Sequence, residues 1–395
     1  MFGSIYIGLS GLAAYSRGLQ QISNNVANLN AQGFKGSTVS FENVLGASGG
    51  SRDGTTTSGG SGVRGAPSRL DFKQGELKQT DRDLDLAIQG NGLLMLLRGD
   101  EVAYTRTGSF EVDRAGRIVL SGTEYQLATR DASGLAKAVS VDLSRTSAPK
   151  ATSKVTFADN LSADLDTAKS LAIGDIAVYD ASGGKHVWTA TFTRETSGTG
   201  TARNWSVKVT DDKGATVDTK TLTFNGGVVD PATAKLDFTD AGSGATASLD
   251  FSSGVTSFAG GSVSTLRVAG SDGYGTGTYT TLGINAAGEI EIGYSNAQKQ
   301  ALGKVAIVDF RNTADLQQRA GGLFSAASNA SREVLASGDP RVGTIQARRL
   351  EASNVDLTLE FSDLILVQRG FQASSQIISV SNEMIQQLFG IRGQG

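Results

Sequence analysis

A seven-residue apolar repeat near the C-terminus constrains this chain more than any other feature. Apolar side chains recur at every seventh position, namely Leu357, Leu364, Phe371, Ile378 and Ile385. Val367 and Leu388 lie on the adjoining ridge of the same helix. A strict seven-residue repeat of this length is typical of long helices with coiled-coil-like packing. A helix of ~35 residues extends roughly 50 Å, which is long for an element inside a β-domain.

A second amphipathic helix is predicted at the other end of the chain. Its apolar residues recur at steps of three, four and seven, which trace one helical stripe: Ile5, Leu9, Leu12, Leu19, Ile22, Val26 and Leu29. For either helix alone, an intramolecular helical hairpin in a monomer is the simpler interpretation. Two long apolar stripes at opposite ends of the chain favour a polymer, because many copies packed side by side bury surface that one pair leaves in water.

The first helix ends in an unusual run of amides. Asn24, Asn25 and Asn28 lie in the stretch SNNVANLNAQGFK, and Gly33 is the expected left-handed stop. Asparagine favours caps and turns, so helix capping is the simpler interpretation on spacing alone. The alternative is a second role, in which these amides bond neighbouring chains. These three residues and the apolar residues of both helices, from Ile5 to Val26 and from Leu357 to Leu388, form the predicted polymerisation interface.

Composition excludes several functional classes. The chain carries 36 basic and 39 acidic residues, a net charge of −3, which argues against binding nucleic acid. It has no cysteine and one histidine, so thiolate and multi-histidine metal sites are excluded. No apolar run reaches the ~18 residues of a membrane span. The N-terminus lacks a basic segment before Arg17, so we expect no cleaved secretory signal.

The sequence offers no convincing catalytic site. Residues 182–185 match the serine–lysine pattern S-x-x-K, but they fall on a predicted hairpin turn and not at the start of a helix. His186 lies in a predicted strand and is expected to be a packed or surface residue. The acidic, glycine-containing turns lack the ligand spacing of a calcium loop. We therefore predict a protein that is not an enzyme and that needs no cofactor.

The sequence between the two predicted helices is typical of β-structure. The chain has 51 glycines and 4 prolines, which suits many tight turns, and residues 108–120 and 188–193 alternate between apolar and polar. The predicted fold is mainly β with long terminal helices that bracket two β-rich domains, one inserted in the other. We expect terminal helical segments at 1–30 and 355–395, extended connections at 31–70 and 325–354, an inner β-domain at 71–147 and 276–324, and an outer β-domain at 148–275.

The two ends resemble the paired signatures of the bacterial flagellar axial proteins, which include rod and hook proteins. SNNVANLNAQGFK matches at one end, and LEASNVDLTLEFSDLILVQRGFQASSQIISVSNEMIQQLFGIR matches at the other. QTDRDLDLAIQGNGLLML and AYTRTGSFEVDRAGRIV resemble the first β-domain of that family, and residues 294–310 are more similar to hook than to rod proteins. The Gly/Ser-rich residues 46–66 keep a distal rod subunit open as an alternative, and Ala31 stands where the family usually has threonine.

The resemblance implies a structural subunit that polymerises into the flexible hook joining rod to filament. It implies export through the flagellar type III apparatus without cleavage and location in the flagellar hook and basal body outside the cell. The implied partners are other copies, rod proteins, the hook cap and hook–filament junction proteins. An alternative from a different class is a β-rich surface adhesin, which does not require paired terminal helices.

Overall fold

The computed structural model describes residues 2–38, 40–45, 60–65, 68–131, 133–166, 169–196, 202–261, 263–327 and 330–392. The chain divides into two compact units. Unit 1 comprises Met1–Leu143, Leu282–Ile292 and Ala301–Gly395, and unit 2 comprises Ser144–Thr281 and Gly293–Gln300. Each unit is described by itself.

The helices are α1 (Phe2–Ala27) and α2 (Leu357–Arg392), with short 3-10 turns at Asp142–Ser144, Thr313–Asp315 and Ala320–Gly322. The strands before unit 2 are β1 (Ser37–Thr38), β2 (Phe41–Leu45), β3 (Gly60–Gly65), β4 (Arg69–Leu70), β5 (Leu77–Gln79), β6 (Asp85–Gln89), β7 (Leu93–Arg98), β8 (Glu101–Thr105), β9 (Thr107–Val112), β10 (Ile118–Leu120), β11 (Gln126–Arg130) and β12 (Ala136–Ala138).

Unit 2 contains β13 (Thr146–Ser147), β14 (Lys154–Asn160), β15 (Ser170–Tyr179), β16 (Lys185–Arg194), β17 (Ala202–Thr210), β18 (Thr216–Asn225), β19 (Val228–Val229), β20 (Lys235–Thr239), β21 (Thr246–Asp250), β22 (Val255–Thr256) and β23 (Arg267–Ser271). The later strands are β24 (Gly277–Ile284), β25 (Glu289–Tyr294), β26 (Lys299–Val305), β27 (Ile307–Phe310), β28 (Leu316–Gln318), β29 (Leu323–Ala326), β30 (Arg332–Leu335), β31 (Thr344–Ala347) and β32 (Arg349–Glu351).

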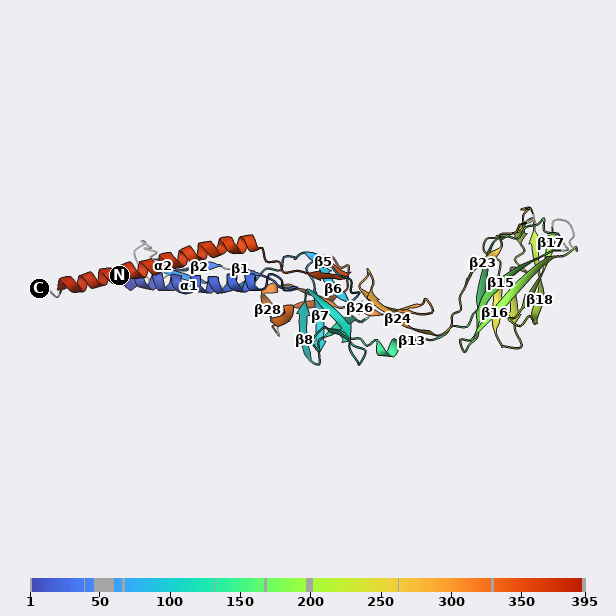
Figure 1. The fold of residues 1–395 in the computed structure, drawn as a ribbon, viewed down its shortest axis with the longest axis horizontal. Helices are drawn as coiled ribbons and strands as arrows, with labels where there is room; N and C mark the ends of the chain where they lie inside the picture. Colours follow the sequence, from blue (N-terminus) through green and yellow to red (C-terminus); the bar gives the residue numbers. More distant parts are fainter. Residues whose placement is uncertain are drawn as a thin grey trace, which may run out of the picture. The chain divides into compact units, whose positions relative to one another are not determined.

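The two terminal helices lie side by side and antiparallel in unit 1 (Figure 1). Asn25 near the end of α1 bonds to Glu360 near the start of α2, whereas Gly8 lies against Ile378 further along. α2 is 36 residues long and α1 is 26, and α2 runs past the first residue of α1. The helices expected at both ends of the chain are therefore present.

The remainder of unit 1 is built on an antiparallel sheet, here called the inner sheet. β7 pairs with β8, β11 and β27, and β6 pairs with β9 and β31. Its core contains Leu93, Met95 and Phe324, and the rings of Tyr104 and Phe310 meet edge to face at 4.9 Å. Edge-to-face contact is a favoured arrangement of aromatic rings, so this core is both apolar and specific in geometry.

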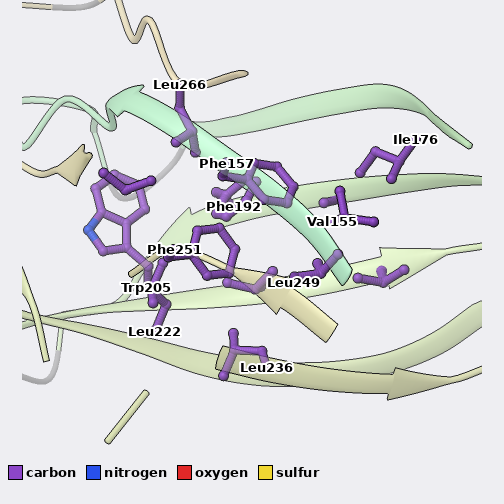
Figure 2. Close-up of a cluster of buried hydrophobic side chains, with 14 of the residues drawn as sticks. Val155, Phe157, Ile176, Phe192, Trp205, Leu222, Leu236, Leu249, Phe251 and Leu266 are labelled. Carbon is purple, nitrogen blue, oxygen red and sulfur yellow. The ribbon is translucent and has the colours of Figure 1, made fainter. Parts of the chain in front are cut away.

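Unit 2 is a β-domain in which alternation determines the core. Trp188, Ala190 and Phe192 on β16 are buried, while the threonines between them are less so. Phe157 stacks on Phe251 at 4.7 Å, and Phe192 approaches the same ring edge-on at 5.9 Å (Figure 2). Because successive side chains of a strand point to opposite faces, this confirms the face predicted from residues 188–193.

The connecting segments differ from the expected extended links. Within 325–354, β30 pairs with β27 and β31 pairs with β6, so this stretch contributes to the inner sheet. Within 31–70, β2 and β3 form a hairpin. Strands of four to six residues are too short to give a clear period, which is why their pairing was not predicted. Most of the Gly/Ser-rich stretch, residues 46–59 and 66, lies outside the described residues.

Candidate polymerisation interface

Small side chains form the contact between α1 and α2. Gly8, Gly11, Ala14 and Gly18 of α1 are buried, as are Ser374 and Ser381 of α2. A Cβ added at Gly11 would lie 2.5 Å from Oγ of Ser374, so the two backbones approach too closely for a larger residue. We call this contact the small-residue seam.

The seam runs beside the predicted row of the C-terminal helix. The row was expected at Leu357, Leu364, Phe371, Ile378 and Ile385. In the structure the buried positions are instead Val367, Ser374 and Ser381, which are also seven residues apart, and Leu364, Ile378 and Ile385 flank them half-buried. Small residues occupy the centre because they let the helices approach closely.

Large apolar side chains flank the seam and face outward. On α2 one strip holds Leu359, Leu366, Ile377, Val380 and Met384, and the other holds Leu357, Phe361, Ile365 and Phe371. On α1 the exposed large apolar residues are Tyr6, Ile7 and Leu9. A shallow hollow of about 450 Å³ opens beside Ile377, Val380 and Met384. Contiguous exposed apolar surface of this kind marks a protein interface.

The predicted interface residues fall into three groups. Ile22, Asn25 and Val367 are buried within the subunit itself. The half-buried residues are Ile5, Leu12, Leu19, Val26, Asn28, Leu364, Ile378 and Ile385, and the exposed ones are Leu9, Asn24, Leu357 and Phe371. The side chain of Leu388 lies outside the described residues. The sequence pattern missed Leu359, Phe361, Leu366 and Val380, whose exposure follows from the position of the seam.

All three amides have partners inside the subunit, since Oδ1 of Asn24 accepts from the Asn28 amide nitrogen at 3.1 Å. The Asn25 amide nitrogen donates to the Ser37 carbonyl oxygen at 2.9 Å and to Oε1 of Glu360 at 2.8 Å. The Asn28 amide nitrogen donates to the Asn24 carbonyl oxygen at 2.8 Å, which caps the end of α1. Gly33 has a φ of 65°, so the predicted left-handed conformation is present, but α1 already ends at Ala27 and Gly33 is not its stop. A hollow of about 660 Å³ remains beside these amides, between the end of α1 and residues 318–322.

Beneath the helices, a buried ion cluster joins four segments of the chain. Nζ of Lys35 lies 2.7 Å from Oε1 of Glu351, and Nε of Arg106 lies 3.2 Å from Oε2. All three side chains are at most 1% exposed. Burial lowers the pKa of Lys35 and of Arg106, and the charge of Glu351 opposes that shift. No local pattern revealed this cluster, since its members are far apart in the sequence.

Main-chain hydrogen bonds complete this cluster. The Gly75 amide donates to Oε1 of Glu351 at 2.8 Å, and the Gly33 amide donates to the Glu351 carbonyl oxygen at 2.8 Å. The Asn354 side chain accepts from the Gly36 amide at 2.8 Å and donates to the Asp71 carbonyl oxygen at 2.6 Å. The chain leaving α1 and the chain entering α2 are therefore bonded to each other and to the inner sheet.

The hairpin of β2 and β3 packs along α1. The Val63 amide donates to Oγ of Ser10 at 3.2 Å, and the rings of Tyr15 and Phe41 lie 5.1 Å apart. Gly62 has a φ of 107°, and a Cβ there would meet Oγ of Ser10 at 2.3 Å. One side of α1 is therefore covered within the subunit.

The serine–lysine pattern falls on a turn, as expected. Oγ of Ser182 donates to Oδ1 of Asp180 at 2.6 Å within the loop between β15 and β16. Nε2 of His186 lies 3.0 Å from Oδ2 of the same carboxylate. Hydrogen bonds from Ser182 and His186 hold the pKa of Asp180 well below its usual range. These contacts stabilise a turn and leave no nucleophile facing a pocket.

In the described part of the chain, no group of three or more histidine, cysteine or acidic residues is arranged to hold a metal ion. Neither α1 nor α2, over its described length, is long and apolar enough to cross a membrane.

Known protein families match three segments of the chain. Residues 5–35 match the family described as "Flagella basal body rod protein", residues 87–160 match "Flagellar hook protein FlgE/F/G D1 domain", and residues 346–391 match "Flagellar basal body rod FlgEFG protein C-terminal". The two terminal matches contain most of α1 and nearly all of α2, and the middle match begins within β6 and contains β7 to β12.

Curated relatives match along nearly the whole chain. The flagellar hook protein FlgE of Escherichia coli (strain K12) is 29% identical over 97% of this chain and 98% of its own length. FlgE of Borreliella burgdorferi is 28% identical over 99% and 100%, and the basal-body rod protein FlgG of Bacillus subtilis is 26% identical over 99% and 100%. A crystal structure of Helicobacter pylori FlgE2 aligns with a TM-score of 0.48 at 13% identity, covering 69% of this chain and 98% of that one, a likeness too low to establish a common fold.

Paired terminal helices with outward apolar strips, joined to β-domains, define a class of subunit made to pack against copies of itself. The matches then identify the particular family: the chain belongs to the flagellar hook and basal-body rod proteins. The family predicted from the terminal motifs is thereby confirmed, and it is a structural family.

Proposed function

We propose that this chain is the structural subunit of the flagellar hook and that it polymerises through the outer faces of α1 and α2. The observation that carries the proposal is the exposure of large apolar side chains on both sides of the seam, such as Leu359 and Leu366 at 65% and 66%. A lone subunit leaves these side chains in water. Neighbouring copies would bury them at roughly 25 cal/mol per Å² of apolar surface.

The proposed interface has an inner and an outer part. The small-residue seam holds α1 against α2 within one subunit, and Ile22 and Val367 belong to it. Leu9, Leu357 and Phe371 of the predicted interface face outward and are assigned to contacts between subunits, as is the exposed amide of Asn24. The half-buried residues, such as Leu12 and Ile378, lie at the border and contribute to both contacts, in a coiled-coil-like arrangement.

The β-structure is assigned to bending. We place unit 2 as an inserted outer domain, because its two segments interrupt unit 1 in the sequence. Threonine- and glycine-rich surfaces slide past one another at low cost, since exposed polar contacts contribute little free energy. Torque would pass along the helices while the outer domains accommodate the changing curvature of a universal joint.

Assembly requires control of the terminal segments. In a free subunit these ends stay unfolded, and the entropy of ordering them is lost only on addition to the polymer. We propose export through the flagellar type III apparatus without cleavage, and addition at the distal tip beneath the hook cap. Further partners are the rod proteins and the hook–filament junction proteins, and the location is the hook of the flagellar basal body outside the cell.

A distal rod subunit is the second candidate, favoured by the full-length similarity to the Bacillus subtilis rod protein FlgG. Deletion of the gene in the source bacterium separates the two functions. Electron microscopy of extracted basal bodies should then show complete rods and rings with no hook, and expression of the intact chain should restore the hook. Truncated rods would instead make the chain a rod subunit.

A further inference from the structure

The ion cluster of Lys35, Arg106 and Glu351 lies where the helices meet the inner sheet. Two cations share one carboxylate, and their remaining N–H groups donate to main-chain carbonyls, including Lys73 O at 2.5 Å and Gly92 O at 2.5 Å. Such a cluster is not the most stabilising solution, because apolar residues of similar volume often stabilise a core as well or better. The cluster instead fixes the relative orientation of the segments it joins, since charge-assisted hydrogen bonds require a defined geometry.

The cluster lies at the connections through which a force on the helices would reach the inner sheet. The chain connects α1 to the inner sheet only through the segment after residue 27, and it connects the inner sheet to α2 only through the segment before residue 357. Glu351 bonds to the first segment through Lys35 and the Gly33 amide. It bonds to the inner sheet through Arg106, and its own amide donates to Oγ1 of Thr107 at 3.0 Å. Both connections are therefore fixed at one carboxylate.

We propose that Glu351, with Lys35 and Arg106, forms a rigid joint that fixes the helix pair to the inner sheet and transmits torque between them. The role of the joint in transmitting torque rests on the proposed function, whereas the existence of the joint does not. Glu351 acts as a positioning residue: it holds the two connections, and the polymer contacts lie elsewhere. Without the joint, the two connections would still keep the bonds of Asn354 and the pairing of β32 with β5, but they would bend more freely.

Hydrogen exchange on the full-length protein, as free subunit and as polymer, tests the joint. In the wild type, the amides of Gly33, Gly36 and Gly75 should be protected in the polymer. Glu351→Gln leaves two buried cations without a counter-ion, and we expect exchange in 31–36 and 73–76 to accelerate at least tenfold. Exchange in β7 and β8 should stay unchanged. Lys35→Met removes one of those cations, so Lys35→Met/Glu351→Gln should exchange more slowly than Glu351→Gln.

The matched control is Glu101→Gln, which changes a surface carboxylate that pairs with Arg98 and Arg319. It should leave exchange at the joint unchanged. Equal acceleration throughout unit 1 would show that Glu351 only stabilises the fold, and unprotected wild-type amides would show that no joint exists; either result overturns the proposal. If Glu351→Gln subunits fail to fold, Lys35→Met alone should accelerate exchange locally by a smaller factor, and no local change there also overturns it.

The swimming of cells with variant hooks tests the role of the joint in torque, separately from the existence of the joint. Hooks built from Lys35→Met subunits should assemble but reduce swimming speed in viscous medium more than in dilute medium. Because hydrogen exchange needs no flagellum, it decides on the joint even if the gene deletion yields truncated rods. Normal swimming at high viscosity, despite local loosening of the joint, would overturn the role in torque.

Discussion

At the scale of single residues, glycine determines how closely the helices pack. A Cβ at Gly11 would meet Oγ of Ser374 at 2.5 Å, whereas a Cβ at Gly3 would have no neighbour within 4 Å. We expect Gly11→Leu to force the seam apart and destabilise the polymer by about 1–3 kcal/mol, a typical cost of overpacking. The midpoint temperature of polymer disassembly measures this effect. Gly3→Leu gains the same helix propensity without the clash, so equal midpoints for the two variants would contradict the seam.

Two carboxylates of unit 2 make its stability depend on pH. Burial raises the pKa of Asp250, but hydrogen bonds from Lys154 and Ser252 outweigh it and bring the pKa to about 2; for Asp272, burial is likewise outweighed by bonds from Ser153 and Lys154, with the same result. A pKa lowered by folding contributes stability above the unfolded value near 3.8. That stability is lost as pH falls towards 2, by about 1–2 kcal/mol for each group.

Tryptophan fluorescence measures this pH dependence in the intact chain. Both tryptophans of the sequence, Trp188 and Trp205, are buried in the core of unit 2, so their emission reports that unit alone. The melting temperature should be constant from pH 7 to 5 and fall between pH 4 and 2. Asp250→Asn should lower the melting temperature at pH 7 and flatten the fall, and an equally steep fall in that variant would contradict the assignment.

At the scale of elements, the outer strips of α2 predict which substitutions block assembly. Leu366 is 66% exposed and lies away from the seam, so Leu366→Glu should leave the subunit folded. In the polymer the added charge would be buried without a partner, which costs several kcal/mol. We therefore expect at least a hundredfold loss of sedimentable polymer. Ser362→Glu adds the same charge at another exposed position of α2, between the two strips, and should assemble normally.

The sequence predicted the two helices but not the contact between them. Their apolar periodicity revealed both helices, and the strand alternation around Trp188 revealed a buried face. A seven-residue count cannot rank parallel rows, however, because the row through Leu364 and the row through Val367 and Ser374 have the same period. Close packing selected the row with small residues, which periodicity of apolar residues alone does not detect.

At the scale of the whole molecule, contacts across long sequence separations escaped prediction. Lys35 and Glu351 are 316 residues apart, and each reads locally as an ordinary charged residue in an extended segment. Their pairing depends on the topology that brings both ends of unit 1 together. The short strands β30 and β31 escaped for the same reason, because their place in the inner sheet is determined by partners far away in the chain. Long helices are encoded locally, whereas the joint beneath them is not.

Removal of residues 148–276 tests the proposed division of labour between helices and β-structure. Ser147 and Gly277 are register partners of β13 and β24, so residues 148–276 can be replaced by an Asn-Gly turn with little strain. The shortened subunits should still polymerise, because α1, α2 and the ion cluster remain. Their hooks should differ from the wild type in curvature and bending stiffness by electron microscopy. Removal of residues 1–30 serves as the control and should abolish assembly, since it deletes one side of the seam. If the shortened subunits stay folded, with wild-type exchange in β7 and β8, and yet fail to polymerise, then residues 148–276 supply assembly contacts and bending is not their separate task.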